Sequence, residues 1–167
     1  QYLRLTVKDL GDDSHRMLTM PVGTPVYVEG PYGAFTPELV KRDHVVMLAG
    51  GVGVTPLRSI LEALPERRHH ITFLYREGDA SETIFREELL ALAARHGAVL
   101  RLLEGHRGSS GMPVDPLAPE WLCRQAPDIL QADVLVCGSR SFTERVLSSL
   151  KTLGVPDDRI HAERFGY

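Results

Sequence analysis

The pattern of hydrophobic and polar positions changes near residue 43. Before it, Leu3–Val7 and Pro25–Glu29 alternate apolar and polar side chains, which is typical of half-buried antiparallel strands. A glycine turn between them leads into a short helix at "GDDSHRML". Strands this few and short are unstable without further partners. We therefore expect residues 1–42 to be the last part of a β-domain whose earlier strands precede Gln1.

From Asp43 onward, strand-like and helix-like patterns alternate. The first strand, "HVVMLAG", is a continuous apolar run of the kind that is buried on both faces of a parallel sheet. A looser segment at 105–131 interrupts the alternation. The predicted strands are 44–50, 70–75, 98–104, 133–138 and 160–163, and the predicted helices are 56–64, 82–95 and 141–153. Residues 43–167 are thus predicted to form an α/β domain with a doubly wound, five-stranded parallel sheet.

Composition narrows the functional classes. The chain has 167 residues, of which 43% are hydrophobic and 25% charged, enough for one domain, or one domain with part of another. A net charge of -3 without long basic runs argues against nucleic-acid binding. Cys123 and Cys137 show neither disulfide-framework nor zinc-site spacing, so we expect no metal. No apolar run has the length of a membrane span, and no signal peptide is recognisable.

The first candidate ligand-binding residues along the chain are the glycines of "AGGVGVTP". Gly50, Gly51 and Gly53 follow the first parallel strand, and Thr55 and Pro56 are predicted as the N-cap and first residue of the next helix. A glycine turn at a helix N-terminus is an anion site, at the sheet edge where α/β proteins bind ligands. The spacing matches neither GxGxxG nor a Walker A loop. Pyrophosphate binding is the favoured interpretation, and a tight turn that needs positive φ is the alternative.

Arg76 follows the second parallel strand. An arginine there accommodates the 2′-phosphate of NADP, whereas an acid binds the ribose 2′-hydroxyl of NAD. Glu77 and Asp79 come directly after Arg76. The residues therefore favour NADPH, with an ordinary surface arginine as the alternative.

Two further segments keep two interpretations each. Cys137 ends a core strand, either as a small buried hydrophobic residue or, with Gly138 and Ser139, as a narrow edge that a flat ring can approach. The terminal aromatics Phe165 and Tyr167 could belong to a docked or a frayed tail, and the frayed tail is the default.

The order of five motifs resembles the ferredoxin–NADP reductase superfamily. These are GPYG, AGGVGVTP, YR followed by FREEL, CGS with Phe142, and a terminal acid-x-Phe. The resemblance covers nearly the whole chain, and within the superfamily it is greatest to the flavin dehydrogenase region of ferric reductases and NADPH oxidases, including bacterial membrane-type relatives. It implies an FAD-binding antiparallel β-barrel, here truncated to residues 1–42, followed by an NAD(P)-binding domain at 43–167.

The same resemblance implies an activity. NADPH, preferred over NADH, would pass hydride to FAD, and single electrons would go on to haem, an iron–sulfur centre or a ferric chelate. The implied partner is a haem-bearing membrane domain, of the same chain or another, which would place these residues on the cytoplasmic side of an integral membrane protein. The alternative is a non-catalytic module that senses NAD(P)H or docks a partner.

The resemblance also implies site residues. Thr55, Cys137, Glu163 and Phe165 would act at the reaction centre, where Phe165 covers the flavin until nicotinamide displaces it. The implied cofactor-binding residues are Gly11, Ser14, Gly30, Pro31, Tyr32, Gly33, Gly50, Gly51, Val52, Gly53, Val54, Thr55, Pro56, Arg76, Cys137, Gly138, Ser139, Phe142 and Phe165.

Two departures from the family pattern matter. The motif that grips FAD would lie before Gln1, and the usual CGP reads CGS. The isolated chain is therefore expected to hold FAD poorly and to be inactive or weakly active.

Overall fold

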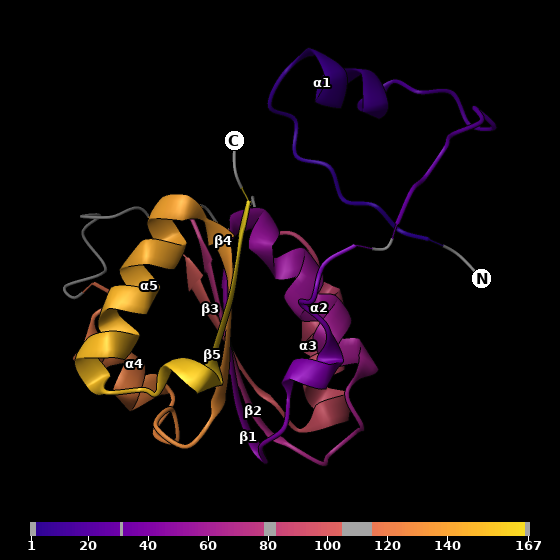
Figure 1. The fold of residues 1–167 in the computed structure, drawn as a ribbon. Helices are drawn as coiled ribbons and strands as arrows, with labels where there is room; N and C mark the ends of the chain where they lie inside the picture. Colours follow the sequence, from indigo (N-terminus) through magenta and orange to yellow (C-terminus); the bar gives the residue numbers. More distant parts are fainter. Residues whose placement is uncertain (1–2, 31, 79–82, 105–114, 166–167) are drawn as a thin grey trace. The chain divides into compact units, whose positions relative to one another are not determined.

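The computed structural model describes residues 3–30, 32–78, 83–104 and 115–165 (Figure 1). The chain divides into two compact units, Gln1–Ala34 and Phe35–Tyr167.

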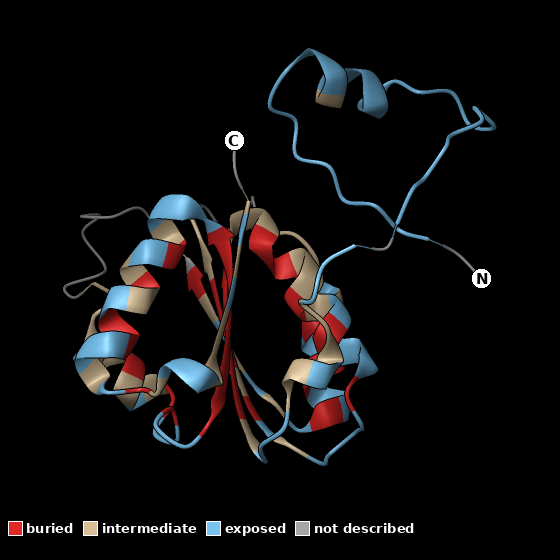
Figure 2. Cartoon of the chain, in the orientation of Figure 1, coloured by how far each residue is buried: buried red, intermediate tan, exposed pale blue. Residues whose placement is uncertain are grey.

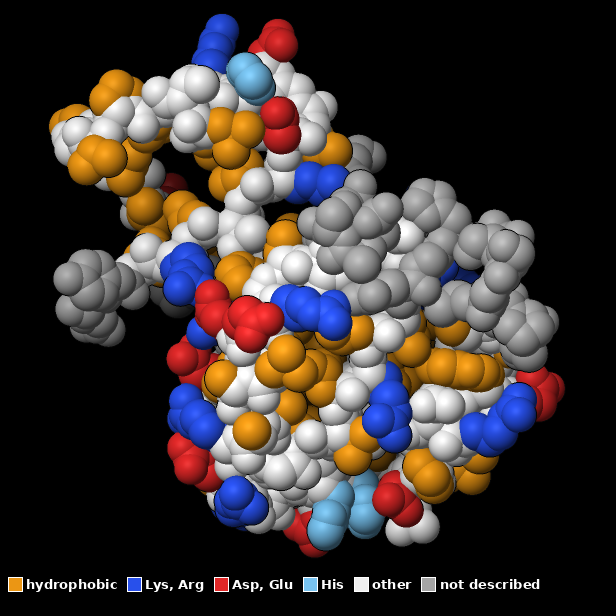
Figure 3. All heavy atoms as spheres, turned by 180° about the vertical axis from the view of Figure 1, so that it is seen from behind, with side chains coloured by type: hydrophobic (Ala, Val, Ile, Leu, Met, Phe, Trp, Pro, Cys, Tyr) orange, Lys and Arg blue, Asp and Glu red, His pale blue; other side chains and the backbone are white. Residues whose placement is uncertain are grey.

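The first unit contains one helix, α1 (Asp12–Leu18), where a short helix is predicted. The strands predicted at Leu3–Val7 and Pro25–Glu29 are wrong, because the described residues of this unit form no strand. Tyr27 is fully exposed, and Figure 3 shows hydrophobic side chains on the surface of this unit. An alternating segment without a neighbouring strand has neither ladder hydrogen bonds nor a face to bury, which explains the failure.

The second unit contains the predicted parallel sheet. Its strands are β1 (His44–Gly50), β2 (His70–Glu77), β3 (Val99–Glu104), β4 (Asp133–Ser139) and β5 (Ile160–Phe165). They pair in the order β3-β2-β1-β4-β5, and every pair is parallel. The doubly wound prediction is confirmed. The chain winds outward in opposite directions from β1 and β4, so the switch point of the topology lies between these two strands.

Helices cover both faces of the sheet (Figure 1). The helices are α2 (Val54–Ala63), α3 (Arg86–His96), α4 (Pro119–Gln125) and α5 (Arg140–Leu153), with 3-10 turns η1 (Pro37–Leu39), η2 (Gly51–Gly53) and η4 (Asp157–Arg159). The pair α2 and α3 lies on one face, and the pair α4 and α5 on the other. Helix α4 falls in the segment predicted to be loose.

The core has two layers because the side chains of each buried strand alternate between the faces. In β1, Met47 packs on the α2–α3 side and Leu48 on the α4–α5 side, and both are fully buried. Figure 2 shows the buried residues along the central strands and the inner sides of the helices. Each such side chain contributes about 2 kcal/mol through burial. The continuous apolar run in the sequence has this physical origin.

A buried carboxylate fixes the segment before β1. Asp133 Oδ2 accepts hydrogen bonds from the backbone N–H groups of Lys41 (2.7 Å) and Arg42 (2.8 Å). Phe35 and Val40 pack against the α2–α3 core layer. The compact unit that holds the sheet starts at Phe35, and the division into two domains between residues 42 and 43 stays a prediction.

No helix in the described ranges is both long and apolar enough to cross a membrane.

His96 should make stability depend on pH. It is buried at the end of α3, and burial, with the Arg95 charge as a second cause, lowers its pKa. Below the unfolded-state pKa of about 6.5, the unfolded chain binds a proton that the folded chain refuses. The free energy of unfolding should therefore fall from pH 7.5 to 5.5, by at most about 1.4 kcal/mol per pH unit from this group. Urea unfolding measures it.

The variant His96→Leu should show a flatter pH dependence over this range, and His15→Asn, at an exposed position, should keep that of the parent. Identical slopes for His96→Leu and the parent would contradict the assignment.

Candidate functional site

The loop after β1 enters α2 through a 3-10 turn. Turn η2 spans Gly51–Gly53 and α2 begins at Val54, so the prediction of Thr55 as N-cap and Pro56 as first helical residue is wrong. The Thr55 hydroxyl instead donates to the carbonyl of Val52 (2.9 Å). Pro56 would be the helical partner of that carbonyl but has no N–H. Thr55 thus compensates for the proline one residue later.

Gly53 holds this loop against β4. A Cβ atom on Gly53 would lie 2.2 Å from the carbonyl oxygen of Cys137 and 2.6 Å from the nitrogen of Gly138. Both atoms belong to backbone, which cannot turn aside as a flexible side chain can. Glycine is therefore required here for close packing inside the protein.

Gly50 and Gly138 are required by an aromatic ring. A Cβ on Gly50 would lie 2.7 Å from Phe142 Cγ, and one on Gly138 would lie 2.6 Å from Phe142 Cδ1. Phe142 packs with the α4–α5 core layer. Its ring thus lies over the ends of β1 and β4, where the sequence analysis expects it to contact a cofactor.

Gly51 is the loop glycine with positive φ, at 54°. The alternative of a positive-φ turn therefore accounts for Gly51, whereas close contacts account for Gly50 and Gly53. The glycines alone do not establish pyrophosphate binding. Their place, at the start of a helix and at the carboxyl end of β1, is what favours an anion.

Three predicted reaction-centre residues come together on the α2–α3 face. In the parallel pairing of β4 with β5, Cys137 lies opposite Glu163 and Ser139 opposite Phe165. Cys137 belongs to the α2–α3 core layer and Phe165 packs against it. Glu163, two residues before Phe165, shares its side of the strand. The tail through Phe165 is docked in the sheet, so the default of a frayed tail is wrong for these residues.

The Cys137 thiol is neutral. It is fully buried, and burial, with the nearby Glu163 charge as a second cause, raises its pKa to about 12. A buried thiol of this pKa is neither a nucleophile nor a proton donor near neutral pH. Its burial agrees with the interpretation as a small hydrophobic residue, and the approach of a flat ring to this strand end stays a prediction. The same small side chain leaves the strand end narrow.

Arg76 is anchored to the sheet. Its Nη1 donates to the backbone carbonyls of Leu103 (2.8 Å) and Glu77 (2.9 Å). The guanidinium is therefore held at the carboxyl ends of β2 and β3, on the same edge of the sheet as the glycine loop.

Glu77 is a neighbour of the loop that the sequence pattern does not reveal. Its Oε2 lies 3.9 Å from where a Cβ of Gly51 would be, and accepts a hydrogen bond from the Tyr75 hydroxyl (3.1 Å). Its Oε1 accepts from the N–H of Gly78 (3.1 Å). These contacts fix a carboxylate beside the glycine loop. The sequence does contain one signal for this contact, because an acidic residue follows the second predicted strand.

Ser139 caps α5. Its Oγ accepts a hydrogen bond from the N–H of Phe142 (3.4 Å), and its carbonyl accepts one from the Thr143 hydroxyl (3.0 Å). A serine in place of the family's proline thus begins the helix that carries Phe142.

The predicted flavin-binding residues of the first unit lie in α1, in the case of Ser14, and in loops, in the case of Gly11, Gly30, Tyr32 and Gly33. The Ser14 hydroxyl accepts from the N–H groups of Leu10 and Gly11 and donates to the Gly11 carbonyl. Tyr32 is exposed, and Gly30 and Gly33 have positive φ. Pro31 lies outside the described residues.

The described residues hold no cluster of three metal-ligating side chains. With a neutral thiol at the strand end, the arrangement offers positioning by backbone and small side chains rather than acid–base or nucleophilic chemistry.

Comparison with known proteins shows the family to which this domain belongs. Residues 47–147 match the family described as the oxidoreductase NAD-binding domain. The chain belongs to this family. Its NAD-binding domain thus includes β1, the glycine loop, β4 and the start of α5, the elements that meet at the switch point.

Curated relatives are reductases or haem proteins by name. The ferredoxin reductase component of a 3-ketosteroid-9-alpha-monooxygenase from Rhodococcus rhodochrous is 32% identical, over 86% of this chain and 40% of the relative. A flavohemoprotein from Pseudomonas putida is 30% identical, over 88% and 38%. NADH-cytochrome b5 reductase 1 from Pyricularia oryzae is 28% identical, over 92% and 53%. The chain spans about half or less of the length of these relatives.

Solved structures share the fold. The flavohem-like FAD/NAD binding domain of nitric oxide dioxygenase from Vibrio cholerae has a TM-score of 0.57 at 27% identity, covering 88% of this chain and 56% of that one. Ferredoxin-NADP+ reductase from Plasmodium falciparum has a TM-score of 0.71 at 17% identity, covering 93% and 65%, and shows the fold alone. The ferredoxin reductase-like NAD-binding domain is confirmed, whereas the ferric reductase and NADPH oxidase subgroup stays a prediction.

Replacing Gly53 should test the contact with β4. In Gly53→Ala, the new methyl group would overlap the Cys137 carbonyl, so we expect a loss of about 3 kcal/mol or more in the free energy of unfolding. Urea unfolding measures it. Gly11→Ala is the control, because nothing lies within 4 Å of a Cβ there. A loss below about 1 kcal/mol in Gly53→Ala would contradict this packing.

Proposed function

We propose that this chain is the NAD(P)H-binding part of a flavin-dependent reductase, in which reduced nicotinamide passes hydride to FAD and electrons continue singly to an acceptor. The observation that carries the proposal is the glycine loop packed against Cys137–Gly138 at the switch point, with Phe165 on the next strand. The reductase names of the relatives support it.

The loop fits a dinucleotide pyrophosphate. The first N–H groups of a helix lack intrahelical partners and point toward its start. The N–H of Val54, the first residue of α2, already donates to the carbonyl of Gly51, so the groups that would reach a ligand are the N–H groups of Gly51, Val52 and Gly53. These backbone groups would hold the two phosphates, helped by the helix dipole.

The strand ends fit the nicotinamide. Cys137 and Gly138 present a small, uncharged edge, because the pKa of the thiol is raised to about 12. Nicotinamide and flavin supply the hydride chemistry when bound. Thr55 and Glu163 would border the ring, and Phe165 would cover the flavin side until nicotinamide arrives. These residues orient the reactants and exclude water.

FAD does not fit the described first unit by itself. Its residues are almost all exposed, and the Ser14 hydroxyl is occupied by its own turn. We propose that residues 1–42 are the end of an FAD-binding barrel, completed by strands outside this sequence. The chain alone would then hold little FAD, and its activity would be weak or absent.

The resemblance of the sequence motifs is the basis for proposing an electron acceptor. We propose a haem-bearing membrane domain of the ferric reductase or NADPH oxidase type, with the present domain on the cytoplasmic side. The five sequence motifs and the order in which they occur support this proposal. The alternative function is a module that binds NAD(P)H without turnover, or docks a partner.

Variants at the strand ends separate turnover from sensing. In the flavin-loaded protein with a complete barrel, Cys137→Ala and Phe165→Ala should each slow hydride transfer by about tenfold or more, since small displacements of reactants cost rates of that order. Stopped-flow bleaching of the flavin measures the rate. The control is Cys123→Ala, at a half-buried position in α4. Unchanged rates in both test variants would refute the reductase roles and favour the sensing module.

Two residues are candidates for determining whether the chain prefers NADPH or NADH, and different contacts support each of them. Arg76, held at the sheet edge by two carbonyls, would bind the 2′-phosphate and favour NADPH. Glu77, fixed beside Gly51, would accept a hydrogen bond from the ribose 2′-hydroxyl and favour NADH. We propose Arg76 as the deciding residue.

Steady-state kinetics with both coenzymes decide between them. Arg76→Ala should raise KM for NADPH about tenfold more than KM for NADH, the size of one lost charge-assisted hydrogen bond. Glu77→Gln should lower KM for NADPH through lost repulsion. Arg68→Ala, at an exposed turn position, should change neither. Equal effects of Arg76→Ala on both coenzymes would refute its role, and a rise in KM for NADH alone in Glu77→Gln would assign the choice to Glu77.

A further inference from the structure

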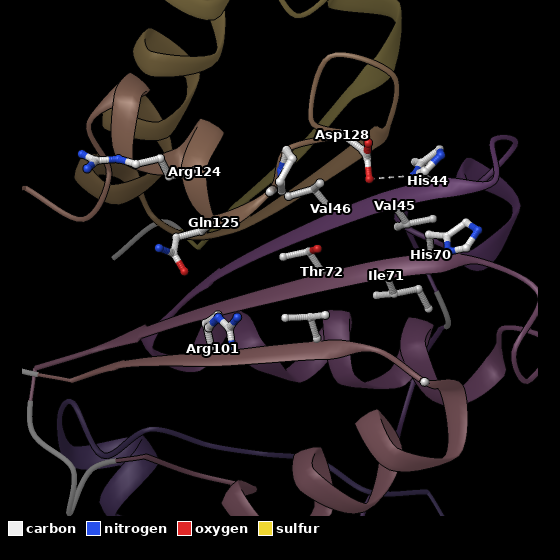
Figure 4. A pocket seen from close by; sticks show the side chains of 14 residues that line it. His44, Val45, Val46, His70, Ile71, Thr72, Arg101, Arg124, Gln125 and Asp128 are labelled. Carbon is white, nitrogen blue, oxygen red and sulfur yellow. Dashed lines mark ion pairs between the residues drawn. The ribbon is translucent and has the colours of Figure 1, made fainter.

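A cavity of about 350 Å³ lies between the sheet and α4, at the amino ends of the strands (Figure 4). His44 and His70, which begin β1 and β2, line it. The glycine loop follows the other end of β1, about 20 Å away for a strand of this length. The cavity is therefore separate from the proposed coenzyme site.

The cavity exists because the α4–α5 layer covers the sheet incompletely. Helix α4 has seven residues, and on the sheet face toward it Val99 is 42% exposed and Arg101 is exposed as well. Of the β3 residues described on this side of the sheet, Leu103 is the one that is buried in the core. Together with Val46 from β1, Val99 gives the cavity an apolar floor.

Hydrogen-bond donors surround this floor. Arg101 from β3, Thr72 from β2 and Gln125 from α4 all line the hollow (Figure 4). Across residues 3–30, 32–78, 83–104 and 115–165, the structure records no hydrogen bond or ion pair for Arg101. Its guanidinium is thus an available fork of donors beside an apolar surface, which matches a carboxylate.

The lining contains one carboxylate, and it is paired. Asp128 Oδ2 lies 3.3 Å from His44 Nδ1, as the dashed line in Figure 4 marks. The His44 ring is in turn stacked on His70, with 5.0 Å between centroids. The carboxylate of the lining therefore lies at the histidine end of the cavity.

We propose that this cavity binds a small organic anion with a planar apolar body and one carboxylate. The body would lie on Val46 and Val99, and the carboxylate would accept two hydrogen bonds from Arg101, with Thr72 and Gln125 as neutral donors. The volume is in the range of small-molecule pockets. The site would be independent of NAD(P)H.

NMR titration with a matched pair of probes tests the proposal. With 2-naphthoate, amide resonances of Thr72, Val99 and Gln125 should shift, and the dissociation constant should be at least about tenfold lower than for neutral 2-naphthamide. Arg101→Gln should abolish this preference, and Val99→Phe should block both probes by filling the floor. Both positions are exposed, so folding should survive. Lys151→Gln, at an exposed position in α5, is the charge-matched control and should bind as the parent does.

Four outcomes would overturn the proposal. The first is equal affinity for 2-naphthoate and 2-naphthamide, and the second is undiminished preference in Arg101→Gln. The third is inorganic phosphate that binds as tightly as 2-naphthoate, which would show that the apolar floor contributes nothing. Shifts confined to the amides of Gly51–Gly53 would also overturn it, because the probe would then occupy the coenzyme loop.

Discussion

The approach of one backbone to another at Gly53 constrains the rest of the candidate site. The loop after β1 touches the Cys137–Gly138 peptide so closely that no side chain fits between them. This contact sets where α2 begins, and with it the direction of the first helical N–H groups. It also joins the two strands that flank the switch point. A dinucleotide bound here would meet a rigid surface made of main chain, which is costly to move and needs no ordering on binding.

The residues around this contact divide between the two faces of the sheet. Cys137 and Phe165 belong with the α2–α3 layer, whereas Phe142 packs with the α4–α5 layer. The first group has the composition expected of a surface that receives a flat ring: small, neutral and partly aromatic. Phe142, in the second group, packs against the strand ends from the α4–α5 side of the sheet. Neither the Cys137 thiol, which burial keeps protonated, nor the two phenylalanine rings offer a nucleophile near neutral pH.

The sequence predicts the sheet well because β1 and β4, at its centre, are nearly continuous buried apolar runs, and strand patterns alternate with helix patterns along the chain. Helix α4 escapes prediction, since seven residues with one fully buried side chain, Leu122, carry too little periodicity. Thr55 looks like a cap because the pattern does not show that Gly51–Gly53 already turns. The strands predicted before Ala34 fail for another reason: strand formation depends on neighbours, and alternation along the chain does not show whether they exist. Contacts such as Glu77 with the glycine loop depend on the assembled sheet edge.

The ring of Phe142 links two glycines that lie far apart in the chain. Gly50 and Gly138 each leave room for the same ring, so a larger residue at either position is tolerable only if position 142 becomes smaller. The three positions thus form one unit of evolutionary change, in which an intermediate with a single replacement carries the cost of a clash. Families that keep a bulky residue at this place in α5 should keep both glycines, and lineages that lose one should show compensation at the other end of the contact.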